Sequence, residues 1–246
     1  MPDDIKHLFP IVDGKPEYTS ETFSMCLEKI NGITFSHLIT NRALTNARLT
    51  KYLAALQSIH LSNGQCAVPI KLAEYFVDKF SKANSENVNI YANYFEKLEA
   101  RFVANYDNIY YQLGDDVNDF KQTLCEKLKV YEQKKLGKPV ICIHGDPVLS
   151  NGILTPAGEI RFLDMRGRLG DAFTTNGDSN YDLAKVYQSL LGYDFIICSK
   201  KTIEAHLELK DVIPGRDIDL LAELRVVFWK FVNHHYGIEE DRKSVV

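Results

Sequence analysis

The sequence predicts an α+β protein that is mainly helical and carries one short β-hairpin-like insert. Two observations lead to this fold class. Apolar residues recur at helical spacing over most of the chain, whereas the short β-branched apolar runs at 140–143 and 160–163 are typical of strands. The chain has 246 residues, of which 45% are hydrophobic and 25% charged, so its size and composition are those of a globular protein.

The first part of the chain predicts little regular structure before a single strand. Residues 1 to about 22 are polar and rich in turn-forming residues, and their prolines prevent a long helix. The run 23–30 is apolar enough for a strand, and Asn31-Gly32 predicts a turn at its end.

Helices account for most of the remaining chain. From about 49 to 60 the apolar residues recur at helical spacing, and Ser62-Asn63-Gly64 predicts the end of that helix. Similar patterns predict helices at about 69–82, 87–112, 116–134, 181–191, 200–210 and 218–235. We interpret the apolar stripe of each helix as the face that packs on the core.

Charge and cysteine usage exclude several classes of protein. The chain has 33 acidic and 29 basic residues, which does not favour a dedicated nucleic-acid-binding protein. No apolar run approaches the roughly 18 to 20 residues that span a bilayer, and the acidic N-terminus does not resemble a signal peptide. The five cysteines are widely spaced and form no C-x-x-C pair, as expected in a reducing compartment. We therefore expect a cytoplasmic protein with no membrane span and no nucleic-acid partner.

The residues best suited to chemistry lie on loops next to the two apolar runs. His144-Gly145-Asp146 follows the first run, Asn151 comes five residues later, and Asp164 follows the second run. Carboxylate and amide oxygens are ligands for a hard cation, and Mg²⁺ is usually held by one or two such groups together with substrate phosphates. Asp146 is then free to accept a proton from an attacking hydroxyl. Each residue also has a simpler interpretation, as a cap or a turn, but the three together favour a site.

The pattern H-G-D-x-x-x-x-N followed by this aspartate resembles the catalytic core of the aminoglycoside phosphotransferase and choline kinase family, which is related in fold to protein kinases. Residues 26–32 resemble the hinge between the two lobes of that family, and residues 52–60 resemble the first helix of its large lobe. Residues 164–167 and 177–185 are similar to kinase-like proteins of bacterial capsule and surface-polysaccharide synthesis. The resemblance spans about residues 23 to 235.

The resemblance implies the C-terminal lobe of a protein-kinase-like fold, in which the β-hairpin insert carries the catalytic loop. Residues 1–30 would be a remnant of the small N-terminal lobe with the hinge strand, and residues 31–246 would form the large lobe. The small lobe, which clamps the nucleotide, is expected to be largely missing. The helices between about 69 and 135 would form the acceptor side of the cleft.

The same resemblance implies a role for each site residue. Asp146 would be the catalytic base, while Asn151 and Asp164 would hold Mg²⁺. His144 and Asp182 would support the catalytic loop. Arg166 would contact substrate or phosphate, or else form a structural ion pair.

The expected function is therefore that of a small-molecule kinase, which moves the γ-phosphoryl of ATP or GTP to a hydroxyl of a sugar or amino alcohol in surface-polysaccharide synthesis. The alternative is a non-catalytic kinase-like binding or assembly module, or the large-lobe fragment of a longer enzyme. Either alternative would favour a homodimer or a separate small-lobe partner. A protein kinase is disfavoured, since Asp164 is followed by Met165-Arg166 where protein kinases have Phe-Gly.

Overall fold

The computed structural model describes most of the chain as an α+β protein that is mainly helical, which confirms the predicted fold class. The described residues are 1–18, 22–65, 88–105, 116–170, 172–198 and 213–238. The helices predicted at 69–82 and 200–210 lie outside these ranges.

The N-terminal residues form a short 3-10 helix, η1 (Lys6–Leu8), and a β-hairpin. Strand β1 (Val12–Tyr18) pairs in antiparallel fashion with β2 (Phe23–Leu27), which confirms the strand predicted at 23–30. Strand β1 was not predicted, because its proline and glycine are unusual in a strand. The structure accommodates them with a shift of register in the middle of β1, where Gly14 takes a φ of 75°.

Two helices follow, each with a threonine at its N-cap. The short strand β3 (Ile33–Thr34) leads into α1 (Phe35–Thr40), and the Thr34 hydroxyl accepts a hydrogen bond from the His37 amide at 3.2 Å. Helix α2 (Asn46–His60) confirms the helix predicted at 49–60. It begins three residues earlier, because Thr45 caps its first turn.

The next two helices pack against each other as a pair. Helix α5 (Asp116–Gln133) agrees with the prediction, but α4 (Phe95–Asn105) starts later than the predicted residue 87. Residues 88–94 are largely turns. The reason is that the Asn89 side chain accepts a hydrogen bond from the Tyr91 amide at 3.0 Å, which competes with helix formation.

The strands in the middle of the chain form small antiparallel sheets. Their bounds, with the 3-10 helix η4, are β4 (Pro139–Val140), η4 (Leu149–Asn151), β5 (Gly152–Leu154), β6 (Ile160–Phe162), β7 (Arg168–Leu169), β8 (Ala172–Phe173) and β9 (Gly177–Asp178). Strand β5 lies between β3 and β6, β4 pairs with β9, and β7 pairs with β8.

The predicted hairpin between 140–143 and 160–163 is therefore wrong. The hairpin is formed by β5 and β6, and the loop with His144 and Asp146 lies before it, between β4 and η4. The run 140–143 leaves the strand early because the Ile143 amide bonds to the Thr175 carbonyl at 2.9 Å and the amides of the next two residues bond to a side chain on α6.

In the described part of the C-terminal region there are three helices, and the predicted helices at 181–191 and 218–235 are confirmed. They are α6 (Ser179–Leu190), α7 (Tyr193–Cys198) and α9 (Gly215–Tyr236). Asp178 caps α6, and Asp217 of α9 receives two hydrogen bonds from Arg42, at 2.6 and 2.9 Å, which tie α9 to the end of α1.

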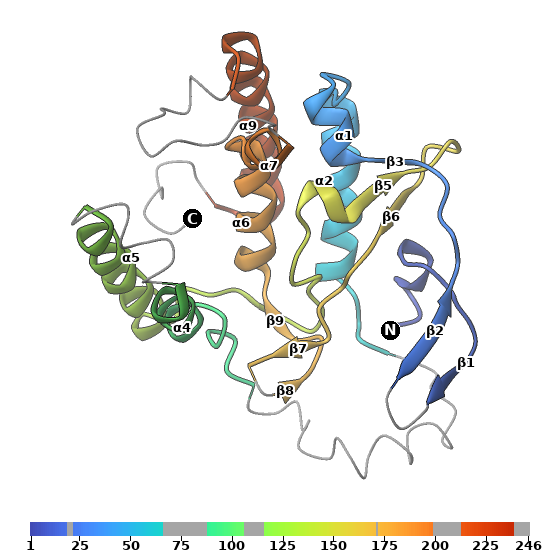
Figure 1. Ribbon diagram of the computed structural model, residues 1–246, viewed down its shortest axis with the longest axis horizontal. Coiled ribbons are helices and arrows are strands. Elements are labelled where there is room, and N and C mark those ends of the chain that lie inside the picture. Colours follow the sequence, from blue (N-terminus) through green and yellow to red (C-terminus); the bar gives the residue numbers. More distant parts are fainter. Residues whose placement is uncertain (19–21, 66–87, 106–115, 171, 199–212, 239–246) are drawn as a thin grey trace.

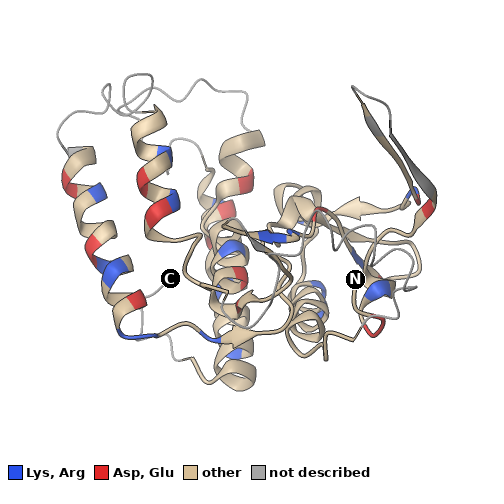
Figure 2. Cartoon of the chain, turned by 90° about the horizontal axis from the view of Figure 1, so that it is seen from below, with Lys and Arg blue, Asp and Glu red and all other residues tan. Residues whose placement is uncertain are grey.

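One hydrophobic core lies between α1, α2, α6, α9 and β6. Figure 1 shows these helices in the middle of the molecule, with the pair α4 and α5 on one side and the β1–β2 hairpin on the other. The α4–α5 pair carries lysine or arginine and acidic residues in alternation along its helices, as Figure 2 shows. Among the described residues, no helix combines the length and the apolar character that crossing a membrane requires.

Candidate active site

The loop between β4 and η4 is held in place by one buried carboxylate. Asp182, in the first turn of α6, is fully buried and accepts hydrogen bonds from the amides of His144 and Gly145, at 2.7 and 2.8 Å. Its Oδ2 also lies 3.0 Å from Nε2 of His60 at the end of α2. Two consecutive buried amides thus find their acceptor on a helix 37 residues further along the chain. Asp182 therefore fixes the path of the backbone on which Asp146 stands.

Asn151 connects the Asp146 loop to the end of β6. Its Nδ2 donates a hydrogen bond to the carbonyl of Asp146 at 2.9 Å. Its carbonyl accepts one from the amide of Leu163, the residue before Asp164, at 2.8 Å. Because Nδ2 is turned to the Asp146 backbone, Oδ1 is the atom of this amide left for a ligand. Asn151 therefore stands between the two aspartates, joined by its own hydrogen bonds to the backbone on each side.

Asp164 follows β6 in a strained backbone conformation. Its φ is 60°, in the left-handed region that non-glycine residues rarely occupy. Two residues on, the amide of Arg166 donates to the carbonyl of His144 at 2.7 Å, so the Asp164 segment runs beside the Asp146 loop. The contact is close: a Cβ at Gly145, whose φ is 83°, would lie 2.6 Å from Cβ of Arg166. Glycine is required at that position for both reasons.

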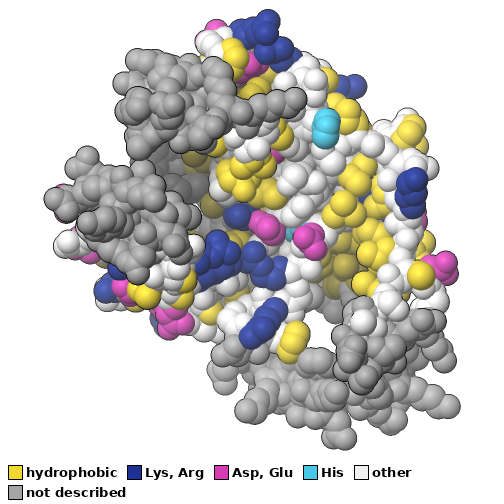
Figure 3. Space-filling model, in the orientation of Figure 1, with side chains coloured by type: hydrophobic (Ala, Val, Ile, Leu, Met, Phe, Trp, Pro, Cys, Tyr) yellow, Lys and Arg dark blue, Asp and Glu magenta, His cyan; other side chains and the backbone are white. Residues whose placement is uncertain are grey.

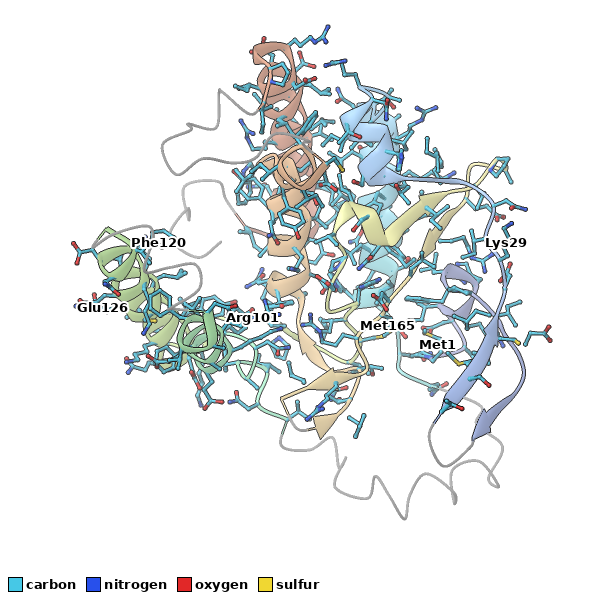
Figure 4. The ribbon with its side chains drawn as sticks, in the orientation of Figure 1. Met1, Lys29, Arg101, Phe120, Glu126 and Met165 are labelled. Atoms are coloured by element: carbon cyan, nitrogen blue, oxygen red, sulfur yellow. The ribbon has the colours of Figure 1, made fainter. Side chains whose placement is uncertain are left out.

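Both carboxylates can be reached from solvent. The side chain of Asp146 is 35% exposed, and Asp164 is exposed. Figure 3 shows acidic side chains in the middle of this face, with lysine and arginine side chains on one side of them and a hydrophobic patch on the other. In Figure 4, Met165, the residue after Asp164, lies in the same central region.

His144 is buried beneath the loop and packs between two phenylalanines. Its ring centroid lies 6.0 Å from that of Phe9 and 5.2 Å from that of Phe162. Burial lowers the pKa of His144, against the opposing charge of Asp182. Its Nδ1 lies 3.2 Å from the Asp146 amide, which donates to it, so the ring is a neutral acceptor at this position.

A group of cations borders Asp146 on the side of α4. Lys185, one turn after Tyr181 on α6, places Nζ 3.0 Å from Oδ1 of Asp146. Arg166 donates to the Tyr181 hydroxyl at 3.1 Å, and its guanidinium lies 5.4 Å from the centroid of that ring. Burial lowers the pKa of Lys97 on α4, while the nearby Tyr181 hydroxyl raises that pKa and the charge of Arg166 lowers it further.

Helix α4 is held near the site by a network around Asp178. This carboxylate is buried, and its Oδ2 accepts hydrogen bonds from the hydroxyls of Tyr94 and Tyr131, both at 2.7 Å. Its Oδ1 accepts from the amides of Lys138 and Asn180, at 2.8 and 2.9 Å. The side chain of Asp178 therefore joins four segments, which are the residue before α4, helix α5, the residue before β4 and the start of α6.

The candidate metal ligands are oxygen atoms. Within the described residues, no group of three or more histidine, cysteine, aspartate or glutamate side chains could hold a metal ion. The carboxylate of Asp164 and the amide oxygen of Asn151 are of the donor type that hard cations take together with phosphate oxygens.

The structure brings the sequence-predicted residues into one region, and it adds others that sequence reasoning missed. Hydrogen bonds described above link five of them, which are His144, Asp146, Asn151, Arg166 and Asp182. Asp164 lies between Leu163 and Arg166, whose amides donate to the carbonyls of Asn151 and His144. The missed residues are Lys185, Tyr181 and Lys97. Helical spacing could have suggested the first two, because they lie within one turn of Asp182. No local signal in the sequence marks Lys97.

Comparison with known proteins found no relative of this chain. No protein-family model, no curated protein and no solved structure matches it. The class of the protein is therefore set by its own features, as a mainly helical α+β chain with a loop site of two solvent-accessible aspartates and a linking asparagine.

Proposed function

We propose that the protein is a Mg²⁺-dependent phosphotransferase that moves the γ-phosphoryl of a nucleoside triphosphate to a hydroxyl of a small molecule. The observation that supports this proposal is that Asn151 is hydrogen-bonded both to the backbone of Asp146 and to that of Leu163, the residue before Asp164. The solvent-accessible carboxylate of Asp146 would then stand close to the oxygens that are proposed to hold Mg²⁺. Phosphoryl transfer needs alignment and charge neutralisation more than covalent help from the protein, and this arrangement supplies both.

Each residue then has a defined task. Asn151 Oδ1 and the Asp164 carboxylate would hold Mg²⁺, which when bound neutralises and orients the phosphate oxygens. A carboxylate oxygen of Asp146 takes the proton of the acceptor hydroxyl while the hydroxyl oxygen of the acceptor bonds to the γ-phosphorus. The bond from the γ-phosphorus to the β–γ bridging oxygen breaks, and a nucleoside diphosphate leaves. Lys185 and Arg166 are positioned to contact negative charge next to Asp146.

The biological setting is proposed from the resemblance of residues 164–167 and 177–185 to kinase-like proteins of surface-polysaccharide synthesis. A sugar or a sugar derivative is the acceptor class that this setting favours. A nucleoside triphosphate as phosphoryl donor fits a protein of the cytoplasm.

The test is nucleotide binding followed by transfer. Calorimetric titration with ATP and GTP, with and without Mg²⁺, should show metal-dependent binding that Asp164→Ala removes. Asp146→Asn should keep that binding but lower the rate of phosphoryl transfer to any accepted hydroxyl by about 10²- to 10⁴-fold. Asp219→Asn, an exposed aspartate of α9, is the matched control and should change neither. Nucleotide binding that is absent, or that ignores Asp164, would contradict the proposal.

A second candidate function, a binding or assembly module, is favoured by apolar surface near the N-terminus. A groove of about 1070 Å³ lies between η1, β1, α2 and β6. Beside it the β1–β2 hairpin exposes Ile11, Val12, Met25 and Leu27. Exposed apolar surface of this kind marks an interface in many proteins. A chain that forms a stable dimer or complex and transfers no phosphoryl group would favour this function over the first.

A further inference from the structure

The lysine and arginine side chains beside Asp146 belong to segments far apart in the sequence. Arg166 follows the Asp164 segment, Lys185 lies on α6, and Lys97 and Arg101 lie one turn apart on α4. Residues four apart share one helical face, and Figure 4 shows Arg101 on the side of α4 that faces β9. Three separate elements thus direct cations toward one place.

Tyr181 is the contact point of this cluster. Its hydroxyl accepts the hydrogen bond from Arg166 at 3.1 Å, and its ring lies 5.7 Å from the Tyr94 ring in an edge-on arrangement. Burial opposes ionisation of Tyr181, but the hydrogen bond and charge of Arg166, with Lys97 and Lys185, bring its pKa below the usual value. The net effect of positive charge therefore outweighs burial at this hydroxyl.

The cluster is short of negative partners. Within the described part of the chain, no carboxylate forms an ion pair with Arg166, Lys97 or Arg101. Burial is the main cause that lowers the pKa of Lys97, and the charges of Arg166 and Arg101 lower it further. These charges therefore oppose one another in the free protein.

Three acidic side chains in this part of the molecule, Glu99, Asp178 and Asp146, already have partners. Glu99, on the same helix, pairs with Lys121 of α5 at 3.2 Å. Asp178 accepts hydrogen bonds from two tyrosines and two amides, and Asp146 pairs only with Lys185. A bound anion would satisfy Arg166 and Lys97 without displacing any of these contacts.

The position of the cluster separates it from the proposed nucleotide phosphates. Those phosphates would meet the metal-binding oxygens of Asn151 and Asp164. Lys97 and Arg101 instead come from α4, and Lys97 is near Tyr181 and Arg166. A small molecule whose hydroxyl lies at Asp146 would reach these cations with another part of its structure.

We propose that the acceptor of the phosphoryl group is itself an anion, a hydroxyl compound with a phosphate or carboxylate group that Arg166, Lys97 and Arg101 bind. This inference rests on the proposed phosphotransferase function. It disfavours choline-like and aminoglycoside acceptors, whose positive charge these residues would repel. A phosphorylated or acidic sugar is the acceptor class that remains.

The experiment measures anion binding with the nucleotide site filled. Inorganic phosphate, and acetate as the carboxylate probe, are titrated by calorimetry into the protein saturated with Mg²⁺–ADP. At least one of the two should bind, and Lys97→Met and Arg101→Met should each weaken that binding about tenfold. Lys127→Met, which removes an exposed lysine from α5, is the matched control and should leave it unchanged.

Several outcomes would overturn the inference. If neither anion binds wild-type protein, there is no anion site here. The same conclusion follows if Lys97→Met binds the preferred anion as tightly as wild type does. A loss of Mg²⁺–ADP affinity in Lys97→Met would assign the cluster to the nucleotide. If Mg²⁺–ADP does not bind wild-type protein, the proposed function fails, and the same titrations without nucleotide still test the cation cluster. Thermal unfolding of Lys97→Met, expected at or above the wild-type temperature because a partly buried charge beside Arg166 and Arg101 is removed, checks its folding.

Discussion

The side chain of Asp182 links the loop that carries Asp146 to the core. It is fully buried and accepts from two consecutive backbone amides while contacting His60, which in turn lies 2.7 Å from the Tyr236 hydroxyl of α9. The loop that carries Asp146 is therefore connected through one carboxylate to α2, α6 and α9. This arrangement makes the position of Asp146 depend on the core and not on the loop sequence alone.

Replacement of Asp182 should accordingly lower the free energy of unfolding by more than the small size of its side chain suggests. Asp182→Ala leaves two buried amides without an acceptor, and we expect a loss of about 3 to 5 kcal/mol in the free energy of unfolding. Asp182→Asn keeps one acceptor oxygen and should lose less, about 1 to 3 kcal/mol. Urea denaturation measures both, with exposed Asp219→Ala as control. A loss below about 1 kcal/mol for the alanine variant would show that the loop does not depend on this carboxylate.

The elements around the site differ in how well their sequence predicts them. Helices α2, α5, α6 and α9 were predicted to within a few residues, because each has a continuous apolar stripe and α2 has a clear end signal. The hairpin was predicted with the wrong first strand, since the run 140–143 was expected in the place that β5 occupies. The strand ends at 140 because the amides of Ile143 and His144 donate to the distant residues Thr175 and Asp182, and no pattern within the run 140–143 shows this.

The same reason explains which site residues were found. Asp146, Asn151 and Asp164 stand close together in the sequence and at the spacing of a known family pattern, so they were recognised together. Lys97 is near the site because α4 is held there by the hydrogen bonds of Tyr94 and Tyr131 to Asp178, and these three residues come from distant segments of the chain. Contacts of this kind follow from tertiary packing, which local sequence patterns do not encode.

The network at Asp178 should therefore matter for both stability and acceptor binding. Tyr94→Phe and Tyr131→Phe each remove one hydroxyl from the same carboxylate oxygen, and each should lower the free energy of unfolding by about 1 to 2 kcal/mol. Tyr193→Phe on α7 is a control, since its hydroxyl makes no hydrogen bond among the described residues.

Because both tyrosines share Oδ2 of Asp178, the double variant should not lose the sum of the two single losses. Tyr94→Phe should also weaken anion binding more than nucleotide binding, because Tyr94 lies at the start of α4 and against Tyr181. Strict additivity together with unchanged anion affinity would contradict a shared role in placing α4.

At the scale of the whole molecule, a buried cysteine thiol and several tyrosine hydroxyls with raised pKa values make the free energy of unfolding depend on alkaline pH. Burial raises the pKa of the Cys142 thiol from 9.0 to about 12, with a smaller contribution from the charge of Asp182. Burial likewise raises the pKa of Tyr94 and Tyr131, which also face Asp178, and that of Tyr236, which faces Asp182. These groups lie in different elements, so their effects combine over the fold.

The direction of the pH effect follows from proton binding. Between the ordinary pKa and the raised one, the folded protein keeps a proton that the unfolded chain has lost, so the free energy of unfolding falls as the pH rises. The fall should begin near pH 9 with Cys142 and steepen above pH 10, where the tyrosines of the unfolded chain ionise. Lys97 and Tyr181 act in the opposite sense, because their pKa values are lowered in the folded protein.

We expect the groups with raised pKa values to prevail, since more of them contribute and their shifts are large. Urea denaturation at intervals from pH 7.5 to 10.5 should give a constant midpoint up to about pH 9 and a declining one beyond it. Cys142→Ala should delay the start of the decline toward pH 10, because its thiol is the first of these groups to ionise in the unfolded chain. A midpoint that rises with pH in this interval would mean that the Lys97–Tyr181 cluster, and not the buried core, governs alkaline stability.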